Sequence, residues 1–443
     1  MTITPRFVTG SLIRHVAVMA GSGAIGLTAV FSVELINLIY VSMLGDQSFT
    51  ASMAFAGVIN FFILSLLMGL MIGVSATVSR TIGAGRSDEA RALATSSFAM
   101  VIGIVVLVAG LTMAFLEPIL YLLGARDRVL SLTYRYMMIA LPATVFLGAG
   151  MVCSTLLRAV GDARRSMMAT LLPAVLTAII DPLFIFTFGL GFDGAAIVVL
   201  IARIALLGIA LYGVLRVHHL FARFDSSRLA RDARQLSVVA VPAVLTNMAG
   251  PLGTAYVTHS IATFGASAVA GQATIERLVP VAFGVIHSLS SAVGPVFAQN
   301  LGANQFDRVR ESLRVSIGFM VFAVGAAWMV LAVFQDPLIR FFSLEGMGAQ
   351  MMHAFCTWIA ASFFFVGALF VANSAFNNLG RPLWSTGFNW ARATLGTIPF
   401  AWWGSHYGPV EVLAGQAFGA VLIGTLALAF AFWLTKALGE QRS

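Results

Sequence analysis

The chain has 443 residues, of which 59% are hydrophobic and only 10% are charged. An average soluble domain carries about 25% charged residues, so a water-soluble fold of this composition would expose very large apolar patches. Lipid must therefore be the solvent for most of the surface. Because a spanning helix uses roughly 20 apolar residues, about twelve of them fit in the chain. The composition excludes a string of soluble domains and predicts an all-α polytopic membrane protein.

The charge balance is basic, with 26 Lys and Arg residues against 18 Asp and Glu residues and a formal net charge of +8. The arginines sit in short loops between apolar segments, where they act as orientation signals, and they form no basic face of the kind that binds nucleic acid. We assign 19 of the 26 basic residues to one side of the membrane and 4 to the other. This split predicts a multi-pass protein of the cytoplasmic (inner) membrane with both termini in the cytoplasm.

Apolar stretches separated by charged, glycine or proline clusters predict the spanning helices. In chain order they cover approximately residues 16–43, 51–79, 93–116, 136–157, 167–188, 195–215, 237–262, 268–297, 312–335, 354–377, 383–403 and 411–435. The segments are long and continuous and lack the alternation of barrel strands, which favours helices. Met1–His15 leads directly into the first segment and predicts a retained helix, not a signal peptide. Cys153 and Cys356 lie inside apolar segments and offer neither a disulfide framework nor a metal-ligand spacing.

The sequence repeats itself at an almost constant offset in the numbering. Gly83-Ala84-Gly85 recurs as Gly302-Ala303-Asn304, Glu117-Pro118 as Asp336-Pro337 and Val160-Gly161 as Leu379-Gly380, each at an offset of 219, and Gly45 pairs with Gly265 at 220. Six segments separate the copies, so both copies have the same orientation, as in the parallel repeats of secondary transporters. We predict an N-lobe of six helices at residues 1–215, a cytoplasmic linker at 216–236 and a C-lobe of six helices at 237–443.

Ionisable groups at membrane depth cost at least ~2.5 kcal/mol each, so each is a functional hypothesis. They are Glu34, Asp181, Glu276, Arg203, Arg277, Arg392, His259 and His287. Asn37 shares the helical face of Glu34, and Thr177 lies one turn before Asp181. A carboxylate buried there can take up a proton near neutral pH or be held ionised by Na⁺, which is the chemistry of an ion-coupling site. The alternative is a carboxylate satisfied by a neighbouring Arg or hydroxyl, with a structural role only.

Glu276 and Arg277 are consecutive and point about 100° apart on a helix, so they need not pair with each other. We predict both as residues of a substrate cavity, where Glu276 can attract cations or carry a proton, and a structural ion pair is the alternative. Arg203 and Arg392 are interpreted as packing or interfacial arginines. The two membrane histidines are interpreted as packing residues and Glu411 as interfacial. No nucleotide-binding loop or pair of zinc-spaced histidines occurs, which excludes an ATP-driven pump in a single chain and gives no sign of an enzyme.

The chain resembles the MATE family, the multidrug and toxic compound extrusion transporters, over nearly its whole length. The resemblance rests on Tyr40-Val-Ser-Met-Leu-Gly45, Ile82-Gly-Ala-Gly85 with Arg86-Ser-Asp-Glu-Ala-Arg91, Leu157-Arg-Ala-Val-Gly-Asp162, Ile180-Asp-Pro-Leu-Phe184, Gly194-Ala-Ala196 and Gln299-Asn-Leu-Gly-Ala303 with Asp307-Arg308. It implies two six-helix lobes around a central cavity, alternating access, and export of amphipathic, often cationic compounds against H⁺ or Na⁺.

Within this family the DinF-like branch is the most similar. Its N-lobe cation site has a Tyr on the fourth helix and a polar residue one turn before an Asp on the fifth, and Tyr136, Thr177 and Asp181 match these positions. Asn37 stands where the branch has a first-helix Asp, and Val199 stands where it has a hydroxyl residue on the sixth helix. Glu34, from the preceding turn, is the candidate for the missing carboxylate. NorM-like members place acidic residues on the seventh and tenth helices, which have none here.

We therefore expect a secondary active antiporter that exports amphipathic, cationic drugs or toxic metabolites by alternating access. Its coupling ion is bound by Asp181, Glu34, Asn37, Tyr136 and Thr177, and H⁺ is favoured over Na⁺. No metal or organic cofactor is expected. The expected partners are small-molecule substrates and membrane lipid, without nucleic acid, and the chain is expected to be a monomer. The alternatives are a lipid-linked precursor flippase from a related two-lobe superfamily and a membrane scaffold without transport.

Overall fold

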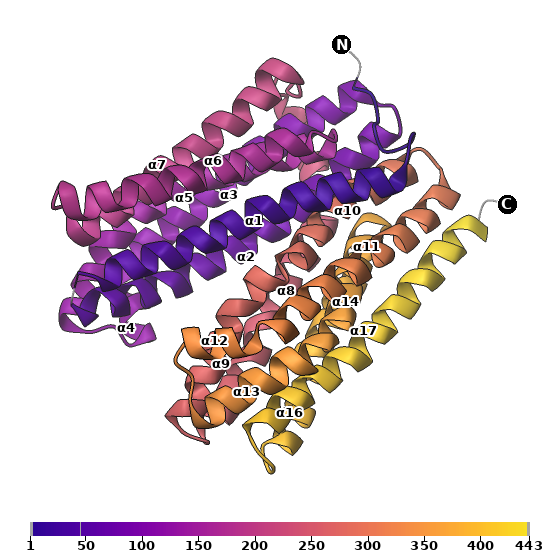
Figure 1. Ribbon diagram of the computed structural model, residues 1–443. Coiled ribbons are helices and arrows are strands. Elements are labelled where there is room, and N and C mark those ends of the chain that lie inside the picture. The colour runs from indigo at the N-terminus through magenta and orange to yellow at the C-terminus, as the bar shows by residue number, and fades with distance from the viewer. Residues whose placement is uncertain (1–2, 45, 441–443) are drawn as a thin grey trace. The chain divides into compact units, whose positions relative to one another are not determined.

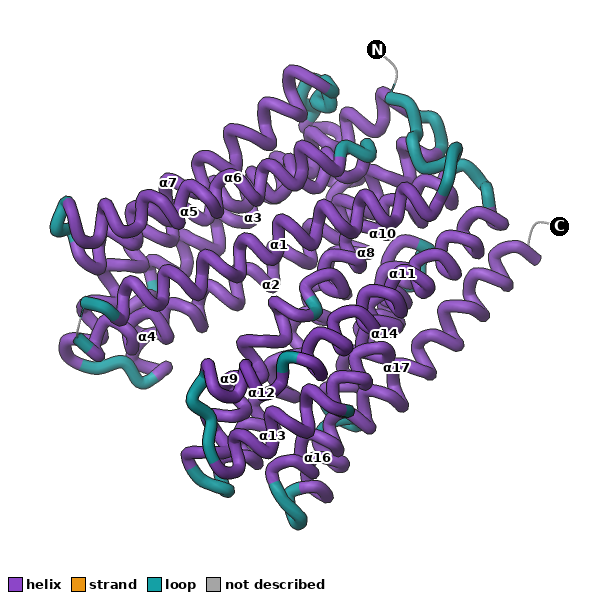
Figure 2. Tube along the Cα trace, viewed as in Figure 1, coloured by secondary structure: helices purple, strands orange, loops and turns teal. Residues whose placement is uncertain are grey.

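The computed structural model describes residues 3–44 and 46–440, and for residues 34, 35, 38, 42 and 47 it describes the backbone alone. This part of the chain folds as long helices joined by short loops (Figure 2). Ten of the described helices are long and apolar enough to cross a membrane, and a bent pair makes an eleventh when it is counted as one span. The prediction of an all-α polytopic membrane protein is therefore confirmed.

The first half of the chain contributes helices α1 to α7 (Figure 1). Their bounds are α1 (Leu12–Ser42), α2 (Gln47–Gly83), α3 (Ser87–Ala114), α4 (Leu116–Leu123), α5 (Asp127–Ala159), α6 (Ala163–Pro182) and α7 (Gly191–Tyr212). Two π-helical turns, η1 (Leu183–Thr187) and η2 (Gly213–Val217), extend α6 and α7. The short α4 follows α3 directly, and Gly124, with a φ of 100°, ends it in the left-handed conformation that favours glycine.

The second half contributes α8 to α17 (Figure 1). Their bounds are α8 (Ser226–Ala262), α9 (Ala266–Ala282), α10 (Gly284–Gly302), α11 (Phe306–Val333), α12 (Gln335–Phe341), α13 (Gly346–Thr357), the 3₁₀ turn η3 (Ile359–Ser362), α14 (Phe363–Asn378), α15 (Pro382–Ala393), α16 (Ile398–Gly404) and α17 (Pro409–Glu440). Helices α9 and α10 meet at an angle of 44° and form the bent pair. Pro280 lies within the last turn of α9, where its missing N–H removes a helical hydrogen bond.

The chain divides into two compact units, which do not follow chain order strictly. One unit contains Ile25–Ala240, and the other combines Pro5–Ala24 with the chain from Val241 onward. The N-terminal segment belongs to the second unit because it bonds to α10. The Phe7 amide donates to the Gln299 side chain at 3.0 Å, and the Ser288 hydroxyl donates to the Ala20 carbonyl at 3.0 Å. The lobe boundaries at residues 215 and 237 stay a prediction. In the structure the second unit also contains the early segment Pro5–Ala24.

The backbone carries the internal repeat that the sequence predicts. Helices α3 and α11 begin and end at the same offset of 219 in the numbering, and so do the starts of α4 and α12 and of α5 and α13. Left-handed residues recur at that offset too. They are Gly85 and Asn304, Gly124 and Ser343, Asp127 and Gly346, and Gly161 and Gly380. Of these pairs the last alone has the same residue in both copies, so the repeat is a repeat of backbone conformation more than of residue type.

The segment predicted as one helix over 383–403 is divided, and that prediction is wrong in detail. Helix α15 ends at Ala393, a turn covers 394–397, and α16 begins with Pro399 in its first turn. The turn closes on itself, since the Gly396 amide donates to Ala391 O at 2.8 Å and the Thr397 hydroxyl donates to Arg392 O at 2.8 Å. A continuous apolar run therefore hides a break whose polar backbone groups are satisfied locally.

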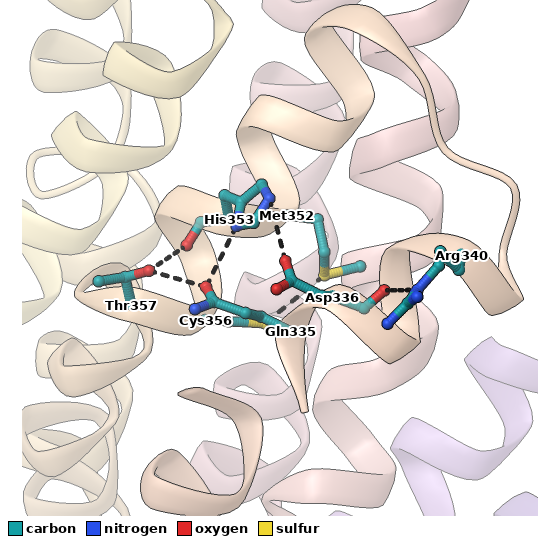
Figure 3. A network of polar contacts seen from close by, with 7 residues as sticks. All are labelled: Gln335, Asp336, Arg340, Met352, His353, Cys356 and Thr357. Atoms are coloured by element: carbon teal, nitrogen blue, oxygen red, sulfur yellow. Dashed lines mark hydrogen bonds and ion pairs between the residues drawn. The ribbon is translucent and has the colours of Figure 1, made fainter. Parts of the chain in front are cut away.

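Helices α12 and α13 are held together by a polar network in the second unit (Figure 3). The ring of His353 lies 3.4 Å from Asp336, and the Thr357 hydroxyl donates to Gln335 at 3.0 Å. Cys356 Sγ contacts Met352 Sδ at 3.7 Å in the same turn. Among the described residues no group of His, Cys, Asp and Glu is arranged to hold a metal ion, so this network acts as a structural tie between the two short helices.

Candidate functional site

Asp181 lies at the carboxyl end of α6, immediately before Pro182 and the π-helical turn η1. Its side chain is fully buried. The Asn37 side chain of α1 donates from Nδ2 to Asp181 Oδ2 at 2.9 Å. The second oxygen, Oδ1, is buried and has no hydrogen-bond partner among the described residues. The structure thus brings together two of the five predicted coupling residues and leaves one carboxylate oxygen unsatisfied.

Tyr136 and Thr177 are also buried in this unit, with 4% and 7% of their surfaces exposed. The Thr177 hydroxyl donates to the Pro173 carbonyl at 2.9 Å, so its proton is used within α6 and only its oxygen lone pairs remain. Tyr136 packs against Phe192 of α7 with ring centroids 5.2 Å apart. The predicted grouping of these two residues around Asp181 stays a prediction.

Glu34 lies in α1, almost one turn before Asn37, and its side chain is outside the described residues. Its predicted role as the substitute carboxylate therefore stays a prediction. Val199 is half-buried in α7 and offers no oxygen ligand. Arg203, on the same helix, donates from Nη1 to the Ala140 carbonyl of α5 at 2.7 Å. That bond ties α7 to α5.

The chemistry of this site follows from its desolvation. A buried ionised carboxylate costs several kcal/mol unless it is paired and fully hydrogen-bonded. One hydrogen bond from a neutral amide to a charged acceptor, worth about 1.5–3 kcal/mol, offsets only a part of that cost. Asp181 can lower its free energy by binding a proton, by binding a cation or by admitting water. Each of these changes the charge or the hydration of the inside of the first unit.

In the second unit Glu276 lies on α9 and has neutral partners. Gln272 donates from Nε2 to Glu276 Oε1 at 2.8 Å, and Thr258 of α8 also bonds the carboxylate. Glu276 and Arg277 are both exposed, and their place in a substrate cavity stays a prediction. The described partners of Glu276 do not include Arg277, which agrees with the expectation that the two need not pair.

Two basic residues, Arg392 and His287, act on each other in the second unit; the sequence predicts Arg392 as a packing or interfacial arginine and His287 as a packing residue. Arg392 lies in the last turn of α15, just before the break, and its Nε is buried without a hydrogen-bond partner among the described residues. His287 of α10 packs edge-on against Phe370, with ring centroids 4.9 Å apart, and interacts electrostatically with Arg392. The Thr-Leu-Gly-Thr-Ile-Pro sequence after Ala393 is the local signal that the helix around Arg392 is irregular.

A charged cluster ties the loop after α5 to the chain after α7. Asp162 caps α6 by accepting from the Arg165 amide, and its Oδ2 lies 2.5 Å from Arg165 Nη1 and 2.7 Å from His218 Nε2. Burial raises the pKa of Asp162, but the hydrogen bonds from His218 and Arg165 outweigh it and hold that pKa well below its usual range. A few residues on, Phe221 packs on Phe98 with centroids 5.0 Å apart. The start of the predicted linker is therefore bound to the first unit through His218 and Phe221.

The model of the family described as MatE matches residues 24–183 and 242–403. A protein of Shewanella oneidensis named FAD transporter is 30% identical over 398 residues, which cover 88% of this chain and 87% of that protein. The multidrug export protein MepA of Staphylococcus aureus is 26% identical over 314 residues, or 68% of this chain and 66% of that protein. A crystal structure of the Vibrio cholerae MATE transporter VcmN matches with a TM-score of 0.92 and 26% identity, over 97% of this chain and 98% of that one.

Proposed function

The chain belongs to the MatE family of transporters, and we propose that it is a secondary antiporter that exports small molecules in exchange for protons bound at Asp181. The observation that carries this proposal is the setting of that carboxylate. It is fully buried, one oxygen accepts from Asn37, and the other has no partner among the described residues. An ionised carboxylate is unstable in such a place, whereas a protonated one is tolerated.

Coupling follows if the two states of the transporter hydrate Asp181 differently. A state that keeps the carboxylate dry favours the protonated form, and a state that opens it to water favours the ionised form. Proton binding then shifts the equilibrium between the states by the difference in its affinity for them. In this scheme Asn37 positions the carboxylate and carries no proton itself.

A proton is the proposed ion because the site is poor in ligands for a metal cation. A hard cation takes several oxygen ligands. Here the described contacts bring together the oxygens of Asp181 and the Asn37 side chain. Thr177 Oγ1 keeps its lone pairs, but no described contact joins it to Asp181, and Val199 supplies no oxygen. A proton needs only one free oxygen, and Asp181 Oδ1 has no partner among the described residues.

The test is export of the cation ethidium from proteoliposomes, driven by an imposed pH gradient with and without Na⁺. Asp181→Asn keeps the size of the side chain and one oxygen that can accept from Asn37 but cannot bind a proton, so gradient-driven export should fall about tenfold or more. Ethidium binding at equilibrium should persist, since the substrate contacts are intact. Glu117→Gln in α4, an exposed carboxylate of the same unit, is the matched control and should export normally.

Export that survives in both Asp181→Asn and Glu34→Gln would show that the coupling assignment is wrong. Export that depends on Na⁺ and ignores the pH gradient would show that the site takes a metal cation. Loss of ethidium binding together with loss of export would point to misfolding or to a substrate role, and the melting temperature of the purified variants separates these two.

We propose amphipathic cations as the first substrate class. Glu276 is exposed, and its described partners are uncharged, so its negative charge is available to a ligand. Glu276→Gln should therefore weaken ethidium binding while leaving proton coupling in place. Relatives named as multidrug export proteins favour the same class.

A flavin dinucleotide is the second candidate, and a specific observation favours it. The relative named FAD transporter matches most of the chain, and Arg392 presents a buried nitrogen without a described partner beside His287. Guanidinium groups bind phosphates through paired hydrogen bonds. Competition between FAD and ethidium for the purified protein distinguishes the classes, because only FAD binding should depend on Arg392.

We propose an inner-membrane location with both termini in the cytoplasm, which rests on the asymmetry of the arginine-rich loops. A fluorescent protein that folds only in the cytoplasm, fused after the last residue, should be bright. A reporter active only in the periplasm should be silent at the same position. The reverse result would invert the topology.

A further inference from the structure

A groove of about 1000 Å³ opens on the second unit, between α16, the first half of α17 and the junction of η3 with α14. Its aromatic lining consists of Trp358, Phe365, Phe400, Trp403, Tyr407 and Phe418. Glu411 is the charged residue among the lining side chains. None of these residues belongs to the predicted coupling set or substrate cavity, and nothing in the transport scheme uses them.

The groove exists because α16 packs closely on α17 (Figure 1), where a glycine of each helix faces a backbone carbonyl of the other. A Cβ on Gly404 would lie 2.2 Å from Glu411 O, and one on Gly415 would lie 2.2 Å from Phe400 O. With no side chains between the helices, the large rings project to the sides. Phe400 and Phe418 meet edge to face at 4.9 Å and form one wall of the groove.

The mouth of the groove has the composition of a membrane–water interface. Trp403 and Tyr407 are 61% and 68% exposed and meet at 5.3 Å. Exposed Trp and Tyr at the end of a span mark the level of the lipid headgroups. Glu411 lies in the first turn of α17 at this end, and its Oε2 lies over the turn at Gly408, where a Cβ would approach to 2.6 Å. The negative charge is therefore at headgroup level.

The rest of the groove runs down the span. Phe418 and Val421 line it seven and ten residues beyond Glu411, which is about 10–15 Å along a helix axis. The hydrocarbon core of a bilayer is about 30 Å thick, so this length is about half of it. The groove thus combines an anionic end at headgroup level with an apolar trough as long as one leaflet.

We propose that this groove binds a phospholipid with an ammonium headgroup, an aminophospholipid such as phosphatidylethanolamine, in the leaflet away from the arginine-rich loops. The ammonium group pairs with Glu411 and lies against Trp403 and Tyr407, whose ring faces attract cations. An acyl chain lies along Phe418 and Val421. Two other ligand classes fit less well. A compact drug cation would fill the mouth and leave the apolar trough empty, and an anionic lipid headgroup would be repelled by the Glu411 carboxylate.

Native mass spectrometry of the full-length protein with phosphatidylethanolamine and phosphatidylglycerol of the same acyl chains tests this site. Wild type should retain phosphatidylethanolamine roughly two- to five-fold better, the factor of one solvent-accessible charge pair. Glu411→Gln should bring the ratio close to one. Glu345→Gln, a carboxylate at the exposed start of α13 outside the groove, is the matched control and should keep the wild-type ratio.

Ala417→Phe is a second variant that fills the trough and leaves the carboxylate in place, so it should reduce retention of the lipid without Glu411 being changed. Equal retention of the two lipids by wild type, or an unchanged ratio in Glu411→Gln, would overturn the proposal. So would displacement of phosphatidylethanolamine from wild type by equimolar tetraphenylphosphonium, since the groove would then be a site for drug cations. The measurement is of binding alone, so its outcome does not depend on proton coupling or on export.

Discussion

Gly419→Ala is the substitution whose cost can be worked most directly from the structure. A Cβ on Gly419 of α17 would lie 1.4 Å from the carbonyl oxygen of Gly396, in the turn between α15 and α16. Real Cβ atoms stay at least 3.0 Å from such an atom, so the two backbones must part by about 1.6 Å at this point. A gap of that size removes most of the dispersion energy of the atoms on each side, since about 0.5–1 Å already forfeits about a quarter to a half.

We therefore expect Gly419→Ala to destabilise the protein by at least the ~1–3 kcal/mol typical of overpacking. The assay is the thermal unfolding midpoint of the purified protein in one detergent, together with lipid retention in the groove beside α16. Gly387→Ala is the matched control. Gly387 lies in α15 with open space around the added Cβ, and Ala there should be neutral or stabilise by about 0.5–1 kcal/mol. A Gly419→Ala midpoint equal to or above that of Gly387→Ala would refute the close approach of Gly396 to α17.

Other outcomes can be stated for the loops and the basic pair. Asp162→Asn should lower the unfolding midpoint at pH 7, and its deficit against wild type should shrink as the pH falls toward 4 and below. The reason is that the pKa of Asp162 is lower in the folded state than the unfolded-state pKa of about 3.9. Ionised Asp162 therefore stabilises the fold at pH values above the unfolded-state pKa, and this stabilisation is lost as the pH falls through the folded-state pKa. A deficit that grows on acidification would contradict this. Gly85→Ala should destabilise by about 1 kcal/mol, because its φ is +73°, whereas Asn304→Gly at the equivalent turn should be neutral or stabilising, as melting curves will report. Arg392→Gln should weaken FAD binding about tenfold and leave ethidium binding unchanged in a fluorescence titration, and equal losses for both ligands would count against a phosphate-binding role.

The positions of the helices and the internal repeat were predictable because both are local properties. Long apolar runs locate the spans, and turn residues such as Gly83-Ala84-Gly85 mark their ends. The break between α15 and α16 has a local signal in Thr394-Leu-Gly-Thr-Ile-Pro399, but its packing was not predictable in this way. It depends on a carbonyl of Gly396 packing against Gly419, and nothing in the apolar composition of either segment announces that contact. The packing of Pro5–Ala24 in the second unit was not predictable either, because it depends on contacts between residues far apart in the sequence, such as the hydrogen bond from Phe7 to Gln299.

At the site, the residue types were predictable and their bonding was not. The rarity of carboxylates at membrane depth singles out Asp181, and the family resemblance adds Asn37. That the Asn37 amide donates to one carboxylate oxygen and leaves the other without a described partner is a property of the packed helices. The surroundings of Arg392 depend on packing in the same way. Arg392 lies in the middle of the apolar segment predicted at 383–403 and is interpreted from the sequence as a packing or interfacial arginine; only the packing around the break places its Nε in a buried position.

The repeat also argues that the proposed proton site belongs to one unit. Helices α6 and α15 begin at the repeat offset of 219, which makes Thr177 correspond to Gly396 and Asp181 to Phe400. The first copy keeps a polar pair on a helix that continues into η1, while the second replaces it with a glycine at a helix break and a phenylalanine that lines the groove. The same stretch of backbone therefore supports a buried carboxylate in one unit and an aromatic, lipid-sized groove in the other. A mechanism that placed equivalent proton sites in both units would need a carboxylate at Phe400, where the chain has none.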